Sequence, residues 1–140
     1  MDAPSWAIDM VRAARVGRLA TASASGQPLV VPVCFALQDE RIYTAVDLKP
    51  KRTRELRRVR NVRENPQVSL VVDEYQEDWA RLAWVMIEGT ARVADGADRD
   101  RGLAALVTKY SQYRVMDLTK NAGDVLAITP ARVVAWRADA

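Results

Sequence analysis

Basic side chains concentrate in one short part of this 140-residue chain, between residues 49 and 63. Eight Lys or Arg side chains stand there against the single acid Glu55, and the rest of the chain has 13 basic and 17 acidic residues, a net charge of −4. The overall charge of +3 is therefore due to this segment. Three interpretations fit it: a solvated helix face, a site for a small anion, or a contact with nucleic acid. We favour the small anion and expect no nucleic-acid partner.

The residue types that are missing restrict the chemistry further. The chain has no His and one Cys, Cys34, which excludes Ser/His and Cys/His nucleophile pairs, the usual zinc ligand sets and an internal disulfide. Cys34 lies in the apolar run 30–37, where a cysteine is more often a small buried hydrophobe than a reactive thiol. No catalytic side chain and no metal site stands out, so a cofactor is expected to supply the chemistry.

The size and the apolar pattern indicate one domain, residues 1–140, large enough to fold around its own core. The longest unbroken apolar run, Leu29 to Leu37, contains Pro32 and is too short to cross a bilayer. The first ten residues contain Asp2 and Asp9 and lack the basic start and apolar stretch of a secretory signal. We therefore expect a cytoplasmic protein with no membrane partner.

Short apolar segments separated by turn residues predict a mainly β fold with some helices. The turn residues 25–27 join two expected strands into a hairpin, and Gly89 suggests a bend or bulge within a later strand. Strands are expected at Gly17–Ser23, Pro28–Leu37, Ile42–Val46, Val68–Val72, Leu82–Val93, Val125–Thr129 and Arg132–Trp136, and helices at Asp2–Ala14, Thr53–Arg63 and Asp98–Tyr110. Six or seven short consecutive strands hide their edges best in an antiparallel barrel with two or three helices.

The order of several short motifs resembles the pyridoxamine-5'-phosphate-oxidase-like (PPOX class) split β-barrels, and within them the deazaflavin branch that uses coenzyme F420. The segments that carry the resemblance are 17–21 (GRLAT), 25–28 (SGQP), 30–33 (VVPV), 43–46 (YTAV), 49–53 (KPKRT), Arg60-Asn61, 65–70 (NPQVSL), Asp78-Trp79 and Gly89. This resemblance covers nearly the whole chain and implies an FMN-binding-type split barrel, PNPOx-like, working as a homodimer.

The resemblance also implies where a coenzyme is held. Its phosphate tail is expected at Lys51, Arg52 and Thr53, in front of the helix after the third strand, where charged side chains and a hydroxyl suit an anion. Lys49 and Asn61 are expected as further contacts, and Arg58 is ranked lower because helical periodicity turns it away from the core side. The ring is expected beside Leu29, Val31, Pro32, Val33, Ala45 and Val46.

Other residues leave alternatives open. Trp79 and Arg81 either reach the coenzyme of the partner subunit or pack on their own barrel, and Lys109, Tyr110, Tyr113 and Arg114 either face the substrate or have structural roles. The implied activity is hydride transfer between reduced F420 and an unidentified small molecule, with a proton from solvent, Tyr113 or a carboxylate. An FMN-dependent oxidoreductase of the same fold and a non-catalytic coenzyme carrier are the alternatives.

Overall fold

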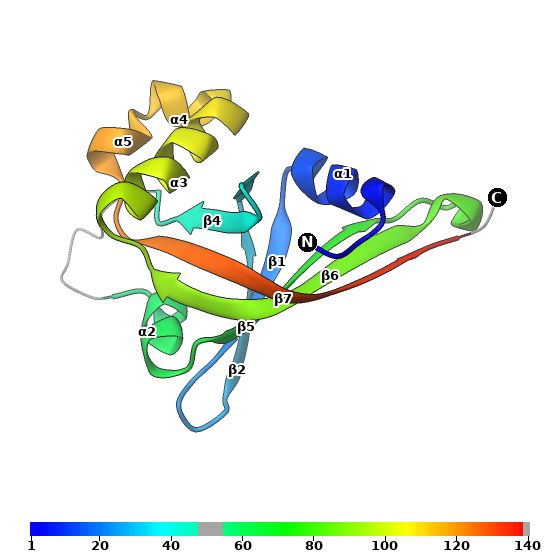
Figure 1. The fold of residues 1–140 in the computed structure, drawn as a ribbon, viewed down its shortest axis with the longest axis horizontal. Coiled ribbons are helices and arrows are strands. Elements are labelled where there is room, and N and C mark those ends of the chain that lie inside the picture. Colours follow the sequence, from blue (N-terminus) through cyan, green and yellow to red (C-terminus); the bar gives the residue numbers. More distant parts are fainter. Residues whose placement is uncertain (48–54, 139–140) are drawn as a thin grey trace.

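The computed structural model describes residues 1–47 and 55–138, and these residues form a seven-stranded sheet with helices on both sides (Figure 1). The strands are β1 (Gly17–Ala22), β2 (Pro28–Val33), β3 (Ala36–Gln38), β4 (Arg41–Ala45), β5 (Gln67–Glu74), β6 (Ala83–Val93) and β7 (Val125–Arg137). The helices are α1 (Ser5–Ala13), α2 (Arg57–Glu64), the 3-10 helix η1 (Trp79–Arg81), α3 (Gly96–Lys109), α4 (Ser111–Val115) and α5 (Leu118–Asn121). The order across the sheet is β2-β1-β5-β6-β7-β4-β3, and every neighbouring pair is antiparallel.

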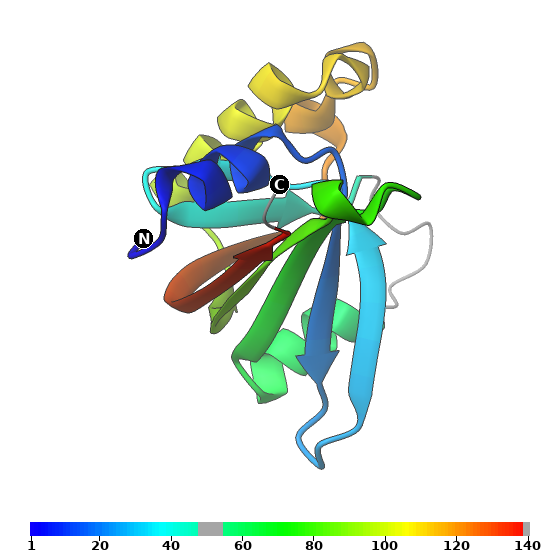
Figure 2. The same cartoon turned by 90° about the vertical axis from the view of Figure 1, so that its right-hand side faces the viewer.

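The two edges of the sheet are joined by a link of two residues, Cys34 and Phe35. β2 forms one edge and β3 the other, so the sheet must curl until the end of β2 at Val33 lies close to the start of β3 at Ala36, as Figure 2 shows. The single strand expected over Pro28–Leu37 is therefore wrong, because the chain leaves one edge at Val33 and enters the other at Ala36. The Tyr110 hydroxyl accepts a hydrogen bond from the Phe35 N–H at 3.1 Å, and its own proton is shared between the Arg15 carbonyl at 2.9 Å and the Phe35 carbonyl at 3.1 Å. Tyr110 thereby gives the buried N–H of this link a partner.

The longest pairing in the sheet is that of β6 with β7. Its register shifts between Glu88 and Gly89, which confirms the bulge expected at this glycine. The two strands expected over 125–129 and 132–136 are wrong, because β7 runs without a break from Val125 to Arg137 and itself contains the extra residue of the bulge, Ala131, opposite Glu88 and Gly89. Both strands bend together there (Figure 1).

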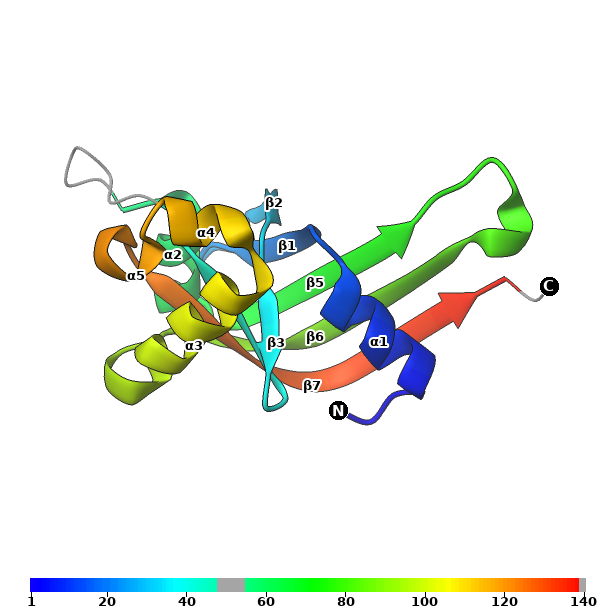
Figure 3. The ribbon, with the colours of Figure 1, turned by 90° about the horizontal axis from the view of Figure 1, so that it is seen from above.

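Two apolar clusters fill the two sides of the curled sheet. Inward residues of the strands, such as Leu19, Leu70 and Ile87, pack with buried residues of α1 and α2. The second cluster lies between the β3–β4 part of the sheet and the group α3, α4 and α5, seen from above in Figure 3. Within the described residues no helix is long and apolar enough to span a membrane.

The helices differ from the expectation at their ends and in number. α2 begins at Arg57, four residues later than expected, since Glu55 and Leu56 are not helical. The short helices α4 and α5 were not expected, because five and four residues carry too little periodicity to be recognised.

Replacing Gly89 with Ala tests the bulge. A Cβ at this position would overlap the carbonyl oxygen of Thr129 and lie 3.0 Å from its carbonyl carbon, so the backbone of β7 would have to move. We expect Gly89→Ala to lower the free energy of unfolding in urea by about 1–3 kcal/mol, the usual cost of overpacking. The control Thr90→Ala, at the exposed neighbour, should cost less than about 1 kcal/mol. Equal midpoints for both variants would contradict this packing.

Candidate coenzyme site

The C-terminal end of β4 is the part of the sheet that leads into the basic segment. Ala45 and Val46 are buried, and Asp47, the next residue, is exposed. The N–H of Val46 donates to the Asp124 carbonyl at 2.8 Å, and its carbonyl accepts from the Gly123 N–H at 2.9 Å. This clamp fixes the direction in which the chain leaves the sheet. The expected phosphate residues Lys49, Lys51, Arg52 and Thr53 lie outside the described residues.

Asp47, Arg58 and Tyr113 come together where the chain leaves β4. The Tyr113 hydroxyl, on α4, donates to Oδ1 of Asp47 at 2.6 Å, and its side chain is almost fully buried. Burial, followed by the hydrogen bond and charge of Asp47, raises the pKa of Tyr113 well above its usual value of 10. Tyr113 is therefore a neutral hydrogen-bond donor at pH 7.

Arg58 is half-buried and within electrostatic reach of this pair. Burial lowers the pKa of Arg58, while the charge of Asp47 opposes that change. Arg58, which helical periodicity turns away from the core side, lies in the first turn of α2 and is not fully solvated. Arg58 provides a fixed positive charge beside the segment that carries Lys51 and Arg52.

Asn61 has a clear structural contact in this arrangement. Its side chain is only 2% exposed, and its amide nitrogen donates to Oγ1 of Thr21 at 3.0 Å. Thr21 is paired with Leu29 across β1 and β2, so this bond attaches α2 to the face that also carries Leu29. The buried Val59 and Val62 complete the attachment.

The residues of β2 expected beside the ring lie on both faces of the strand. Leu29, Val31 and Val33 point to the interior, whereas Pro32 points outward and is paired with Arg18. β2 is an edge strand, the usual place for proline in a sheet, because an edge has backbone groups without a ladder partner. The structure therefore combines an apolar interior face with an accessible edge.

Trp79 and Arg81 lie at the other end of the molecule, in the connection between β5 and β6 (Figures 1 and 3). Trp79 is 67% exposed, and its indole N–H donates to the Tyr75 hydroxyl at 3.5 Å. Arg81 lines a separate hollow of about 660 Å³ that also contacts Trp6 of α1. In the structure of the single chain these residues do not join the group at the end of β4.

Sequence analysis missed Asp47, and it left the role of Tyr113 open. The available signal for Asp47 was its position, since it is an acidic residue that directly follows an apolar strand and precedes a basic segment. The partner of that acid comes from residue 113, a separation that no local pattern reveals. Of the other residues considered for a substrate pocket, Tyr110 is buried at the edge link and Arg114 donates to the Val107 carbonyl at 2.7 Å.

A curled antiparallel sheet, closed by a short link between its edges and covered by helices at one end, defines the split β-barrel class. The chain belongs to the pyridoxamine 5'-phosphate oxidase family, whose model matches residues 7–137. This match confirms both the family and the fold class expected from the sequence.

The chain is similar to proteins that are named for different activities or ligands. It is 31% identical over 92% of its length, and 79% of the relative's, to a 5a,11a-dehydrotetracycline/5a,11a-dehydrooxytetracycline reductase of Streptomyces rimosus. A FAD-binding protein of Mesorhizobium loti is 25% identical, with a TM-score of 0.69 over 95% of this chain and 93% of that one. A heme-binding protein of Mycobacterium smegmatis is 20% identical, with a TM-score of 0.74 over 99% of this chain and 56% of that one, a likeness of fold alone.

Replacing Tyr113 with Phe tests the Asp47–Tyr113 contact. Loss of a hydrogen bond to a charged group should lower the free energy of unfolding by about 1–2 kcal/mol at pH 7. The matched control is Tyr75→Phe, because that hydroxyl belongs to a 61% exposed side chain and lies 3.3 Å from Glu77. We expect less than about 0.5 kcal/mol there.

The pH dependence of the same variant gives a second check. Because the pKa of Tyr113 is raised by folding, its contribution to stability is complete below the unfolded value of about 10 and is lost as the pH rises above it. The difference between wild type and Tyr113→Phe in urea unfolding should therefore stay constant up to about pH 9 and shrink beyond pH 10. A difference that shrinks between pH 6 and 8 would contradict the assigned contact.

Proposed function

We propose that this chain is an oxidoreductase that uses coenzyme F420 to reduce a small organic molecule. The observation that carries the proposal is the 31% identity, over 92% of the chain, with a protein named as a reductase. The family match over residues 7–137 supports the same class of chemistry. The motif resemblance described above favours F420 over FMN.

The donor chemistry at the end of β4 fits a coenzyme with an anionic tail. Arg58 supplies a half-buried cation, and the adjacent segment supplies Lys49, Lys51, Arg52 and the hydroxyl of Thr53. Cations and hydroxyl donors are the usual partners of phosphate oxygens. We propose that these residues bind the tail and that Leu29, Val31, Pro32, Val33, Ala45 and Val46 lie beside the ring.

When bound in its reduced form, the deazaflavin supplies a hydride. The protein contributes binding, orientation and exclusion of water. In the described residues, the charge of Asp47 favours the protonated form of Arg58, while Asn61 fixes α2 against β1. Tyr113 is not the proton donor in this proposal, since its proton is held by Asp47 and its pKa is raised. The proton then comes from solvent.

Titration with each coenzyme tests this assignment, because F420 carries carboxylates beyond its phosphate and can use more of the cations than FMN can. We expect tighter binding of F420 than of FMN in fluorescence quenching, with a preference that weakens at high salt. Tighter binding of FMN would favour an FMN-dependent oxidoreductase instead. The FAD-binding structural relative is consistent with that alternative. Binding of neither would contradict the oxidoreductase assignment.

The double variant Lys51→Ala/Arg52→Ala tests the anion site itself. Loss of two charged hydrogen bonds should weaken binding of the coenzyme by about 2–5 kcal/mol. Arg54→Ala is the matched control in the same segment and should change little. If the double variant binds both coenzymes as well as the wild type does, the phosphate site lies elsewhere. If it instead loses tight binding of DNA, the nucleic-acid interpretation is correct.

We also propose a homodimer, supported by the outward face of the sheet. In the register of β5, β6 and β7, Val71, Met86 and Val134 lie side by side and Trp84 is paired with Trp136. The same face carries Val30, 62% exposed, and Pro32 on β2, while Trp136 is 46% exposed. Arg18 lies between Pro32 and Val71 in this register, so the apolar row is confined to β5, β6 and β7. An apolar row on an outward sheet face is typical of a protein–protein interface. A second copy of the chain is the proposed occupant.

Substitution of Met86 with Glu tests the dimer. A carboxylate in the middle of the row would be buried without a partner in a dimer but would face water in a monomer. We expect light scattering to give a dimer for the wild type and a monomer for Met86→Glu, with unchanged circular dichroism. Val115→Glu is the control, since Val115 is 89% exposed on α4 and lies outside the row. A monomeric wild type at micromolar concentration would contradict the proposal.

A further inference from the structure

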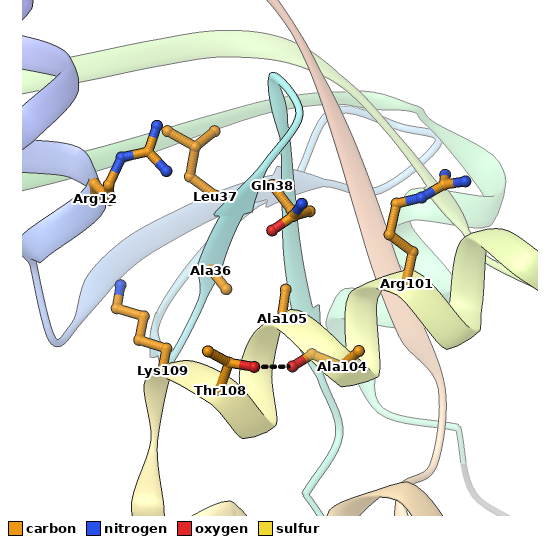
Figure 4. Close-up of a pocket in the computed structure, with 9 residues that line it drawn as sticks. All are labelled: Arg12, Ala36, Leu37, Gln38, Arg101, Ala104, Ala105, Thr108 and Lys109. Carbon is orange, nitrogen blue, oxygen red and sulfur yellow. Dashed lines mark hydrogen bonds between the residues drawn. The ribbon is translucent and has the colours of Figure 1, made fainter.

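A second cavity lies away from the candidate coenzyme site, between the C-terminal half of α3, strand β3 and helix α1 (Figure 4). Its volume is about 360 Å³, near the lower end of the usual range for small-molecule sites. Arg12, Arg101 and Lys109 line it, and none of the described residues that line it is Asp or Glu. The charge of this cavity is therefore positive.

Lys109 is the least satisfied polar group that lines the cavity. Its Nζ is buried and has no hydrogen-bond partner among the described residues. It lies 4.1 Å from the ring centre of Phe35 and 5.4 Å from that of Tyr110. Such cation–π contacts favour an ammonium group but leave its N–H donors without acceptors, so the group still needs an oxygen partner.

The free carbonyls at the C-terminal end of α3, which a lysine in the last turn often binds, have other partners here. In α3 the Lys109 carbonyl accepts from both terminal nitrogens of Arg15 at 3.3 Å, and the Val107 carbonyl accepts from Arg114 at 2.7 Å. The ammonium of Lys109 therefore has no structural partner at the helix end.

The surroundings of Lys109 also favour an anionic partner for its ammonium group. Burial and the charge of Arg15 lower the pKa of Lys109 to about 8, and the neighbouring Cys34 has only a smaller, opposing effect. An anion beside Nζ would reverse the lowering, because it stabilises the charged form of the amine. Binding of an anion and protonation of Lys109 should therefore support each other.

Arg101 on the far side of the cavity is also incompletely paired. Its nearest acid is Asp98, at 3.9 Å. The carboxylate of Asp98 already accepts hydrogen bonds from Arg92 at 2.5 Å and from the Tyr43 hydroxyl at 2.7 Å. Figure 4 shows Arg12 and Lys109 on one side of β3, and Arg101 on the other side, beyond Gln38. The cavity thus offers cations at both ends.

We propose that this cavity binds a small organic anion whose carboxylate or phosphate group is held by Lys109 and Arg12. The short apolar side chains of β3 and α3, among them Ala36, Ala104 and Ala105, would contact its apolar body. Gln38 and Arg101 are available to a second polar group on the ligand. The apolar lining favours an organic anion over a bare inorganic ion. This proposal does not depend on the coenzyme assignment.

The test uses three probes on the full chain: benzoate, its neutral isostere benzamide, and inorganic phosphate. We expect benzoate to shift the amide NMR signals of Ala104 and Ala105 in a saturable manner, phosphate to do so more weakly, and benzamide not at all. Benzoate should also bind more weakly as the pH rises through about 8, where free Lys109 loses its proton. Phosphate binding more tightly than benzoate would overturn the preference for an organic anion over a bare inorganic ion.

Variants locate the binding group. Lys109→Met keeps the stem of the side chain against the two rings and should weaken benzoate binding about tenfold or more, the equivalent of one charged contact. Arg12→Gln, at an exposed position, should weaken it less and serves if Lys109→Met fails to fold. Lys120→Met, exposed on α5 and outside the cavity, is the matched control. Equal binding of benzoate and benzamide, no saturable shift, or unchanged affinity in both cavity variants would overturn the proposal.

Discussion

The fold depends on how one chain crosses between the two edges of its own sheet. The crossing uses only Cys34 and Phe35, so there is no room for a loop that solvent could hydrate. Phe35 is fully buried, and the Tyr110 hydroxyl accepts its N–H while facing its carbonyl. A buried backbone group without such a partner costs about as much as a lost hydrogen bond. Tyr110 therefore allows the sheet to close.

The C-terminal end of α3 and the helix α4 that follows it carry residues of both sites. Tyr113 lies three residues beyond Tyr110, and their rings pack edge to face with centres 5.3 Å apart. Tyr110 holds the edge link, while Tyr113 reaches Asp47 where β4 leads into the basic segment. Lys109, directly before Tyr110, faces the cavity on the α1 side. One helix end thus connects sheet closure, the candidate coenzyme site and the positive cavity.

Sequence patterns predicted the elements whose signals are local. The hairpin of β1 and β2, the bulge at Gly89 and the buried face of α2 all follow from spacing within a few residues. The break at Cys34 is invisible to such reasoning, because an apolar run looks the same whether it stays on one edge or crosses to another. The Asp47–Tyr113 bond and the position of Arg58 depend on packing between distant segments, which spacing does not encode.

The central claim is that the protein transfers a hydride and does more than hold a coenzyme. Its most direct test is to mix the protein with reduced F420 and a panel of unsaturated carbonyl acceptors, and to follow the return of the oxidised coenzyme's absorbance. The account predicts oxidation that requires both the protein and one class of acceptor, with a rate proportional to protein concentration. Tight coenzyme binding without turnover of any acceptor would contradict the claim of hydride transfer and would identify the protein as a coenzyme carrier.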